Sequence, residues 1–539
     1  MSGSITLENR FGVNKMELIS LKYAIFVIVL LVLYYCFPKK YRWYVLLAGS
    51  MAYYVIICKW YVLFIIFTIC TTYGSTIWID KLLKKQNAIV KSHKEDWDRQ
   101  TRKDYKEKGR KKRVAVMLFA LLCNFGILAF LKYIPYAGEL GLLLPLGISF
   151  YTFQSMGYVM DVYREIVEPE KNFLKVALFV SFFPQIIQGP IAIYDKLAGQ
   201  LYEGHSLRLE NLQKGALLVL WGVMKKLVIA DRAVNIINFV MDKPMDFSGT
   251  YVFFAAVVYA LQLYADFSGG IDIVRGIAEM FGITMSTNFN HPYFSRSLTE
   301  YWHRWHMTLG DWCRNYIFYP LSISKRFLNF GKWLKPRFGA HISKVLPGCI
   351  ASVITFIVIG VWHGANMKYL YFGLWNGFVI MLAELFAPVN KKVAGGFFKL
   401  TGLREKGIFA TIVSVLWTFM LILVGYYFDI AANASTAFHM LFKSVTDFHI
   451  SELGINNIIL NLGACGLDEY DILLLIICTL LWFFISFVEE NKKLDMRDFI
   501  LSRKLPLRWA IIYLGIFIVI IFGYYGPGVN PADFVYMQF

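Results

Sequence analysis

Long apolar stretches recur along the whole chain, and they constrain its fold more than any other feature. A helix needs about 20 mostly apolar residues to cross a bilayer. Hydrophobic residues make up 57% of the 539 residues, which is more apolar surface than a soluble core can hide. The stretches that reach or approach a spanning length are 21–37, 43–58, 61–79, 114–131, 142–160, 173–187, 217–229, 252–267, 346–362, 369–386, 408–428, 472–488 and 509–525.

These stretches predict an all-α polytopic membrane protein, because lipid offers no partner to an unpaired backbone group. Several of them are short or contain proline and glycine. We therefore expect about eleven crossings together with a few re-entrant helices. The first stretch begins at Leu21 with no basic segment or small-residue cleavage site before it, which indicates an anchored helix and not a cleaved signal.

The net charge is +18, and the basic and acidic residues are concentrated in different segments of the chain. Residues 81–113 contain fourteen Lys and Arg against five acidic residues, 322–345 contain six against none, and 389–406 contain five against one. Residues 428–471 contain one Lys against six acidic residues. The positive-inside rule predicts that the three basic segments are cytoplasmic and that the acidic segment and the N-terminus are outside. The orientation of the chain in the membrane thereby explains its excess of basic residues, and no nucleic-acid partner is expected.

This topology divides the chain into three predicted parts. Residues 1–20 form an extracytoplasmic N-terminal segment. Residues 21–427 form the membrane core, which includes the basic loop 81–113. Residues 428–539 supply an extracytoplasmic loop and two closing transmembrane helices.

Residues 288–320 carry polar and aromatic side chains at helical spacing. One stripe consists of Trp302, Trp305, Leu309, Trp312 and Tyr316, and a polar stripe consists of Arg304, Thr308, Asp311 and Asn315. We expect one amphipathic helix that is capped by Ser297 or Thr299, is ended by Pro320, and lies re-entrant or at the cytoplasmic interface. His303 and His306 have a spacing that two metal ligands use, but no third ligand is near in sequence and no metal site is predicted.

His363 is a further histidine that the sequence singles out, and it is expected in the membrane body. It follows the apolar stretch 346–362, and Gly364 and Ala365 leave the backbone beside it open to close approach. Ionisable groups inside a membrane body are functional candidates, and histidine is suited to proton transfer near neutral pH. A packed, hydrogen-bonded histidine at a helix end is the alternative interpretation.

Several motifs together resemble the membrane-bound O-acyltransferase (MBOAT) family, in the bacterial branch of alginate O-acetylases (AlgI-type) and teichoic-acid D-alanyltransferases (DltB-type). The matching stretches are PLGISFYTFQSMGYVMDVYR at 145–164, FFPQIIQGPI at 182–191, KKLVIADR at 225–232, YALQLYADFSGGIDIVRGIAEMFGI at 259–283, NFNHPYFSRSLTEYWHRWHMTLGDW from 288, VWHGA at 361–365 and FVYMQF at 534–539. The resemblance implies a ring of tilted helices around a central tunnel. His306 would lie toward the cytoplasmic end of that tunnel and His363 deeper, toward the outside.

The resemblance implies that His363 and His306 are the catalytic residues. His363 would act as the general base for an acceptor hydroxyl. His306, Asn366 and the backbone N–H groups around Gly364 are candidate donors to the carbonyl oxygen of a thioester. Residues with a supporting or substrate-binding role would be Arg304, Asp311, Asn366, Trp305, Trp362, Asp266 and Ser268. Arg304 and Asp311 are expected on one helix face, and Asp266 and Ser268 are expected to orient the histidine helix.

The expected function is transfer of an acyl group, acetyl in the first place, from a cytoplasmic thioester to hydroxyls of an exported polysaccharide. No bound cofactor is expected, and the donor would be acyl-CoA or an acyl-carrier thioester. Expected partners are membrane lipid, the polysaccharide acceptor and a secreted or membrane-anchored acetylase, and the expected location is the bacterial cytoplasmic membrane. The alternatives are D-alanyl transfer toward teichoic acid, a polysaccharide or lipid transporter with a histidine proton relay, and recruitment of a soluble acetylase.

Overall fold

The computed structural model describes residues 16–134, 138–142, 144–401, 404, 407–454, 457, 465–526 and 534. Within these residues the chain is helical and has no strand, which confirms the predicted all-α class. The chain forms two compact units, 1–219 with 271–286, and 220–270 with 287–539. Residues 1–15 of the predicted N-terminal segment and residues 535–539 of the last motif lie outside the described residues.

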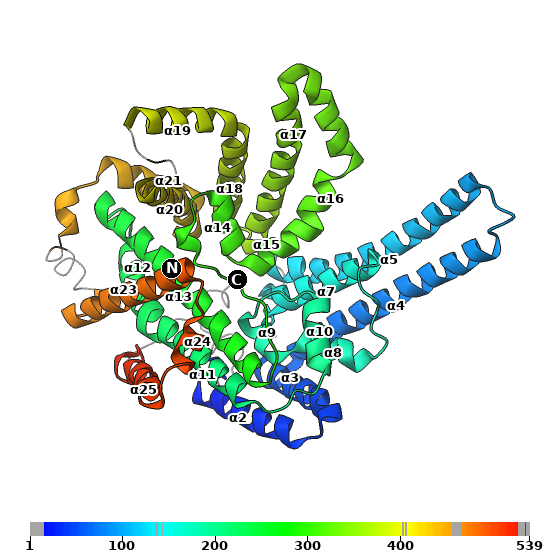
Figure 1. Ribbon diagram of the computed structural model, residues 1–539, viewed down its shortest axis with the longest axis horizontal. Coiled ribbons are helices and arrows are strands. Elements are labelled where there is room, and N and C mark those ends of the chain that lie inside the picture. Colours follow the sequence, from blue (N-terminus) through cyan, green and yellow to red (C-terminus); the bar gives the residue numbers. More distant parts are fainter. Residues whose placement is uncertain are drawn as a thin grey trace. The chain divides into compact units, whose positions relative to one another are not determined.

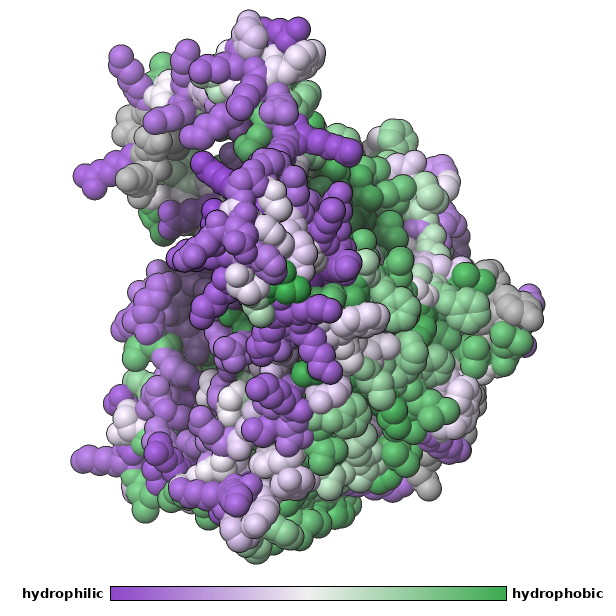
Figure 2. All heavy atoms as spheres, turned by 90° about the vertical axis from the view of Figure 1, so that its right-hand side faces the viewer, coloured by the Kyte–Doolittle hydropathy of each residue, from purple (hydrophilic) through white to green (hydrophobic). Residues whose placement is uncertain are grey.

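The first unit contains a long helical hairpin. Its helices are α4 (Val62–Ser92) and α5 (Arg99–Tyr133), and Asp98 caps the start of α5 by accepting hydrogen bonds from the backbone N–H of Thr101 and Gln100. The two helices run side by side and project from the rest of the unit (Figure 1). Figure 2 looks onto the end of this hairpin and shows hydrophilic side chains gathered there, beside a surface that is largely hydrophobic.

The core of the first unit is α7 (Ile148–Tyr163), whose residues from Ile148 to Val162 are all buried. A helix that is buried all round packs inside a protein and does not face lipid. Gly147 starts it at φ 69°, where a Cβ would meet the carbonyl oxygen of Ile186 at 2.2 Å, so only glycine fits. The other helices of this unit are α2 (Leu21–Cys36), η1 (Lys39–Tyr41), α3 (Arg42–Cys58), η2 (Lys59–Tyr61), α8 (Phe173–Ser181), α9 (Phe183–Gln188), α10 (Tyr194–Tyr202) and the first part of α11 (Leu209–Met224).

The second unit is built around α17 (Lys325–His363) and α18 (Met367–Leu385), which lie side by side (Figure 1). A Cβ on Gly360 would meet the carbonyl oxygen of Tyr369 at 2.3 Å, and one on Gly373 would meet that of Phe356 at 2.3 Å. Small residues allow such close packing between membrane helices. The close contact brings the end of α17 against the first turn of α18.

Some of the remaining helices of the second unit follow predicted apolar stretches, whereas others lie between those stretches. These remaining helices are the end of α11, the π-helical turn η3 (Lys225–Ala230), α12 (Asp231–Met241), most of α13 (Gly249–Met280), η4 (Pro292–Phe294), α14 (Leu298–Arg304), α15 (Met307–Cys313), the π-helical turn η5 (Arg314–Phe318), α16 (Tyr319–Ser322), α19 (Ala387–Thr401), α20 (Ile408–Ile430), α21 (Ala434–Thr446), η6 (Ile450–Leu453), α23 (Glu469–Lys492), α24 (Met496–Leu501) and α25 (Leu505–Phe522).

Seven helices among the described residues are long and apolar enough to cross a membrane, or eight if the bent pair α18 and α19 is one span. The multi-pass architecture is confirmed, but the expected count of about eleven is not. Two stretches counted as candidate crossings form the buried helix α7 and the short pair α8 and α9. Apolar composition alone cannot separate a buried helix from one that faces lipid.

The single amphipathic helix expected over 297–320 is wrong. Ser297 caps α14 as predicted, by accepting a hydrogen bond from the backbone N–H of Glu300, but the helix stops at Arg304. His306 takes a left-handed conformation at φ 43°, and α15 starts after it. The backbone N–H of Met307 donates to the carbonyl of Asn288 at 2.9 Å, so tertiary hydrogen bonds replace the helical ones at the break.

Two of the basic segments that follow this region in sequence are largely helical. Most of 322–345 is the first half of α17, which has a non-helical kink at Gly339 (φ 80°), and most of 389–406 is α19. Pro320 does not end a helix, because it lies in the first turn of α16. Proline is tolerated there, since the first N–H groups of a helix have no partner within it.

Candidate active site

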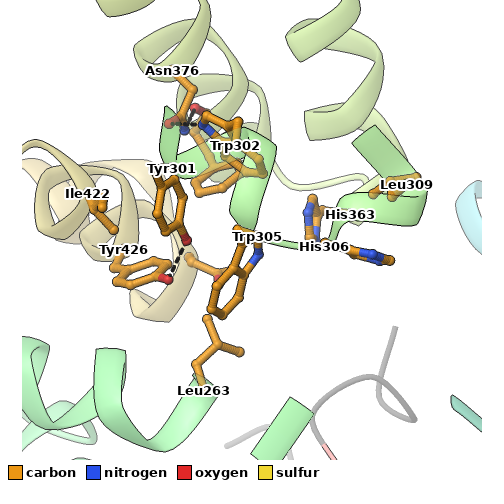
Figure 3. Close-up of a pocket in the computed structure, with 12 residues that line it drawn as sticks. Leu263, Tyr301, Trp302, Trp305, His306, Leu309, His363, Asn376, Ile422 and Tyr426 are labelled. Carbon is orange, nitrogen blue, oxygen red and sulfur yellow. Dashed lines mark hydrogen bonds between the residues drawn. The ribbon is translucent and has the colours of Figure 1, made fainter. Parts of the chain in front are cut away.

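His306 and His363 line one pocket in the second unit. They come from different elements, since His306 lies at the break before α15 and His363 is the last residue of α17. Figure 3 shows the two imidazole rings near one another at one side of the pocket. The other lining residues are Leu263, Tyr301, Trp302, Trp305, Leu309, Phe372, Asn376, Ile422, Tyr426 and Asp429.

The side chain of Asn288 fixes the ring of His306. Its Oδ1 accepts hydrogen bonds from the backbone N–H of Thr308 at 3.1 Å and from the Thr308 hydroxyl at 2.8 Å. The Nδ1 of His306 lies 3.2 Å from the same oxygen. A backbone N–H can only donate, so this oxygen is an acceptor and Nδ1 must carry the proton. The neutral ring therefore has its lone pair on Nε2.

His306 is buried, with 2% of its surface exposed, and it lies outside the candidate membrane spans. Burial, and to a smaller extent the positive charge of a protonated His363, lower its pKa to about 3. His306 is thus held neutral, as a proton acceptor through Nε2. The edge-to-face contact with Phe267, at 4.9 Å between ring centroids, fixes its other side.

Aromatic rings enclose His363. The ring of Tyr369 stacks on it at 6.0 Å between centroids and 20° between planes, and Phe372 packs edge-on at 5.5 Å. Trp362 is buried and contacts both histidines, at 4.9 Å from His363 and 6.4 Å from His306. A stacked ring restricts the imidazole to one orientation, as proton transfer requires.

The wall of the pocket consists of hydrogen-bonded aromatic residues. The hydroxyls of Tyr301 and Tyr426 lie 2.8 Å apart, and the Trp302 indole donates to Asn376 Oδ1 at 3.0 Å. Figure 3 shows these side chains across the pocket from the histidines. Trp305 lies in the same wall, where it was predicted to be a supporting residue.

Asp266 and Ser268 lie beside Phe267 on α13 and do not line the pocket. Lys226 donates to Asp266 at 2.7 Å and pairs with Asp231 at 2.8 Å, and Lys225 donates to Ser268 at 2.8 Å. These contacts hold the turn of α13 whose Phe267 contacts His306. Both lysines belong to the motif KKLVIADR, and lysines inside an apolar stretch are themselves a functional signal.

Arg304, Asp311 and Asn366 do not line the pocket. Arg304 pairs with Glu300 at 2.7 Å and Glu490 at 3.0 Å, whereas Asp311 pairs with Arg314. The expectation that Arg304 and Asp311 share one helix face is wrong, because the break at His306 separates their helices.

Asn366 is exposed, caps α18 by accepting from the Lys368 N–H, and donates to the carbonyl of Ala432 at 3.3 Å. Asn366 is therefore close to His363 in sequence but does not line the pocket. Asn288 and Asp429 are site residues that sequence reasoning did not single out. The signal for Asp429 was a lone carboxylate directly after the apolar stretch 408–428.

The protein thus combines a multi-pass helical fold with a pocket that two histidines line, an arrangement typical of a membrane enzyme. Residues 169–335 match the model of the MBOAT, membrane-bound O-acyltransferase family. The resemblance read from the motifs is thereby confirmed for this part of the chain, which belongs to a multi-pass membrane protein.

Curated relatives extend this match. The chain is 30% identical over 315 residues to a probable alginate O-acetylase AlgI of Pseudomonas syringae pv. tomato, covering 58% of this chain and 54% of the relative. It is 29% identical to the peptidoglycan O-acetyltransferase of Helicobacter pylori, covering 51% and 56%. It is 26% identical to the teichoic acid D-alanyltransferase of Bacillus subtilis, covering 52% and 67%. The match spans little more than half the length of the alginate O-acetylases.

Proposed function

We propose that the protein is a membrane-bound O-acyltransferase that moves an acetyl group from a cytoplasmic thioester to a hydroxyl of an exported polysaccharide. The observation that carries this proposal is the placement of His306 and His363 in one pocket. The family match over 169–335 supports the reaction class. The O-acetylases among the relatives are more similar to this chain than the D-alanyltransferase is, which favours acetyl over D-alanyl.

In the proposed reaction, the hydroxyl oxygen attacks the thioester carbonyl while His363 takes the hydroxyl proton. The carbon–sulfur bond then breaks, the proton passes to the leaving thiolate, and the products are an ester and a free thiol. His306 offers a lone pair at Nε2, so it can accept a proton or a hydrogen bond in this transfer. This argues for a place in the proton path and against the role of a donor to the carbonyl oxygen.

The proposed supply of substrates follows the charge pattern. The acetyl donor, as acyl-CoA or an acyl-carrier thioester, would arrive from the side of the basic segments, which attract anionic donors. The polysaccharide, with or without a partner acetylase, would arrive from the other side. We place the protein in the bacterial cytoplasmic membrane with its N-terminus outside, as the positive-inside rule indicates.

The test uses the purified full chain in proteoliposomes, supplied with radiolabelled acetyl thioester and polysaccharide. Covalent label on the polysaccharide, absent from the His363→Ala variant, is expected. Uptake of polysaccharide without covalent label would support the transporter alternative instead. Full acetylation by a His306→Ala/His363→Ala double variant would show that a recruited acetylase performs the chemistry.

A further inference from the structure

Asp429 is the one acidic residue among those that line the histidine pocket in the described part of the chain. It lies at the C-terminal end of α20 and is only partly exposed. A carboxylate in a pocket lined largely by aromatic rings is destabilised unless hydrogen bonds or charges compensate it. The position of Asp429 is fixed from two directions, by its own side chain and by its backbone.

The side chain is held by Tyr259, whose hydroxyl donates to Asp429 Oδ2 at 2.7 Å. Among the described residues, no protein group donates a hydrogen bond to Oδ1. An ionised carboxylate accepts several hydrogen bonds. One oxygen is thereby used for positioning, and the other remains available to a ligand in the pocket.

The backbone around Asp429 is held by Lys368. Its Nζ donates to the carbonyl oxygens of Asp429 and Ala431 at 2.7 Å each. A cation at a helix C-terminus stabilises the unpaired carbonyls and the helix dipole. The charge of Lys368 also acts on the Asp429 carboxylate, but its hydrogen bonds go to carbonyl oxygens and leave the carboxylate oxygens free of a bond to this lysine.

The same lysine links Asp429 to His363. Lys368 Nζ lies 4.8 Å from the centroid of the Tyr369 ring, and that ring stacks on His363. The chain of contacts runs from the imidazole through Tyr369 and Lys368 to the end of α20. The carboxylate and the imidazole are therefore held in a fixed relation on the wall of one pocket.

The chemistry of the surrounding wall indicates which substrate the carboxylate faces. Tyr301, Trp302, Trp305 and Tyr426 offer apolar ring surface, and Asn376 adds an amide. Flat rings with a few convergent polar groups suit a sugar or another polyol, whose C–H faces are apolar and whose hydroxyls donate hydrogen bonds. A carboxylate accepts hydroxyl hydrogen bonds strongly but repels anions.

We propose that Asp429 binds the acceptor by accepting a hydrogen bond from a hydroxyl next to the one that reacts at His363, and that it selects an acceptor unit without negative charge at this position. The inference rests on the proposed acyltransferase function. It assigns Asp429 to acceptor specificity and gives it no part in proton transfer.

The test compares two oligosaccharide probes, the neutral cellopentaose and the anionic pentamer of galacturonate, on wild type and Asp429→Asn. Asparagine keeps the shape and still accepts from Tyr259 but lacks the charge. Acceptor binding is followed by tryptophan fluorescence, because Trp302 and Trp305 line the pocket, and acetyl transfer is followed separately. Losing a charged hydrogen bond predicts about 10- to 100-fold weaker binding of cellopentaose, together with loss of the preference for cellopentaose over the galacturonate pentamer.

Two variants serve as controls. Tyr259→Phe removes the bond to Asp429 Oδ2 but keeps the charge, so the preference for the neutral probe is expected to persist. Asp272→Asn changes a carboxylate that pairs with Arg275 and does not line the pocket, so it is expected to change neither readout. A merely structural role for Asp429 would lower thermal stability in both Asp429→Asn and Tyr259→Phe without changing the preference between probes.

An unchanged binding preference in Asp429→Asn would overturn the inference. A loss confined to an aminoacyl donor, with acceptor binding intact, would overturn it as well, because the carboxylate would then face a donor ammonium. Acceptor binding that depends on Asp429 without any acetyl transfer by wild type would instead count against the proposed function. The two failures are therefore distinguishable.

Discussion

The Oδ1 of Asn288 accepts a hydrogen bond from Nδ1 of His306 at 3.2 Å, across 18 residues of sequence. The same oxygen accepts a hydrogen bond from the backbone N–H of Thr308 in the first turn of α15. Asn288 therefore acts both as a cap for that helix and as the group that fixes the histidine tautomer. The helix break that sequence periodicity did not predict is what makes this arrangement possible.

Replacing Asn288 with alanine should lower kcat for acetyl transfer by about 10- to 100-fold, in the range seen for loss of a group that orients a reacting residue. The KM values should change little, because Asn288 does not line the pocket. Steady-state kinetics on the full chain in nanodiscs measures both. A rise in KM at constant kcat would contradict a role in fixing the tautomer.

Asn288→Asp should change the pH profile instead. An added carboxylate favours the protonated form of His306 and raises its pKa from the low value that burial gives. If neutral His306 is required, activity should then be lost at low pH, and the acidic limb of kcat should move toward higher pH than in wild type. The kcat of both proteins measured from about pH 4 to pH 8 checks this, and identical limbs would exclude a required neutral His306.

His363→Ala should reduce acetyl transfer by a factor of about 100 to 10,000, the usual contribution of a positioned general base. Its thermal unfolding should stay close to that of wild type. His439→Ala is the matched control, because His439 is exposed on α21 and does not line the pocket. Acetyl transfer at the wild-type rate by His363→Ala would contradict the proposed mechanism.

The sequence located most of the helices and both histidines, because apolar stretches and buried ionisable groups are local signals. Ser297 as a cap and His363 at the end of an apolar helix could be read directly. The helix break at His306 could not be predicted from the sequence, since it depends on hydrogen bonds to residues 288 and 290, which lie far from it in sequence. A helical period cannot reveal that a distant backbone segment competes for the same N–H groups.

The lining of the pocket was predictable only in part, for a similar reason. Asp429 is linked to His363 only indirectly, through Lys368 and Tyr369, and Asn376 accepts a hydrogen bond from Trp302 of another helix. Burial also could not be read from composition, since α25 is the more apolar of the two in sequence, yet α7 is enclosed and α25 has no buried residue. These relations arise from tertiary packing and have no local pattern.

Lys226→Met should destabilise the protein by about 3–5 kcal/mol, because it leaves the buried carboxylates of Asp231 and Asp266 without their cation. Lys84→Met is the control, since Lys84 is 64% exposed in its pair with Asp80 and such a pair contributes about 1 kcal/mol or less. Thermal unfolding in one detergent ranks the variants. Equal losses for the two would mean that the buried cluster does not hold α13.

Gly360→Val should disrupt the approach of α17 to α18 and with it the position of His363. A Cβ at Gly360 would sit 2.3 Å from the carbonyl oxygen of Tyr369, an atom of the backbone that cannot rotate away. Helix separation would cost about 1–3 kcal/mol, as overpacking generally does, and it would shift the Tyr369 ring from His363. Activity should therefore fall further than stability alone explains.

The control for this change is Gly348→Ala, also on α17, where a Cβ would meet nothing within 4 Å. Removing a glycine from a helix interior there should be neutral or stabilise by up to about 1 kcal/mol. The comparison is made by thermal unfolding and acetyl transfer on both variants. If Gly360→Val retained wild-type activity, close packing of α17 on α18 would not be what positions His363, and the aromatic stack on Tyr369 would have to do so alone.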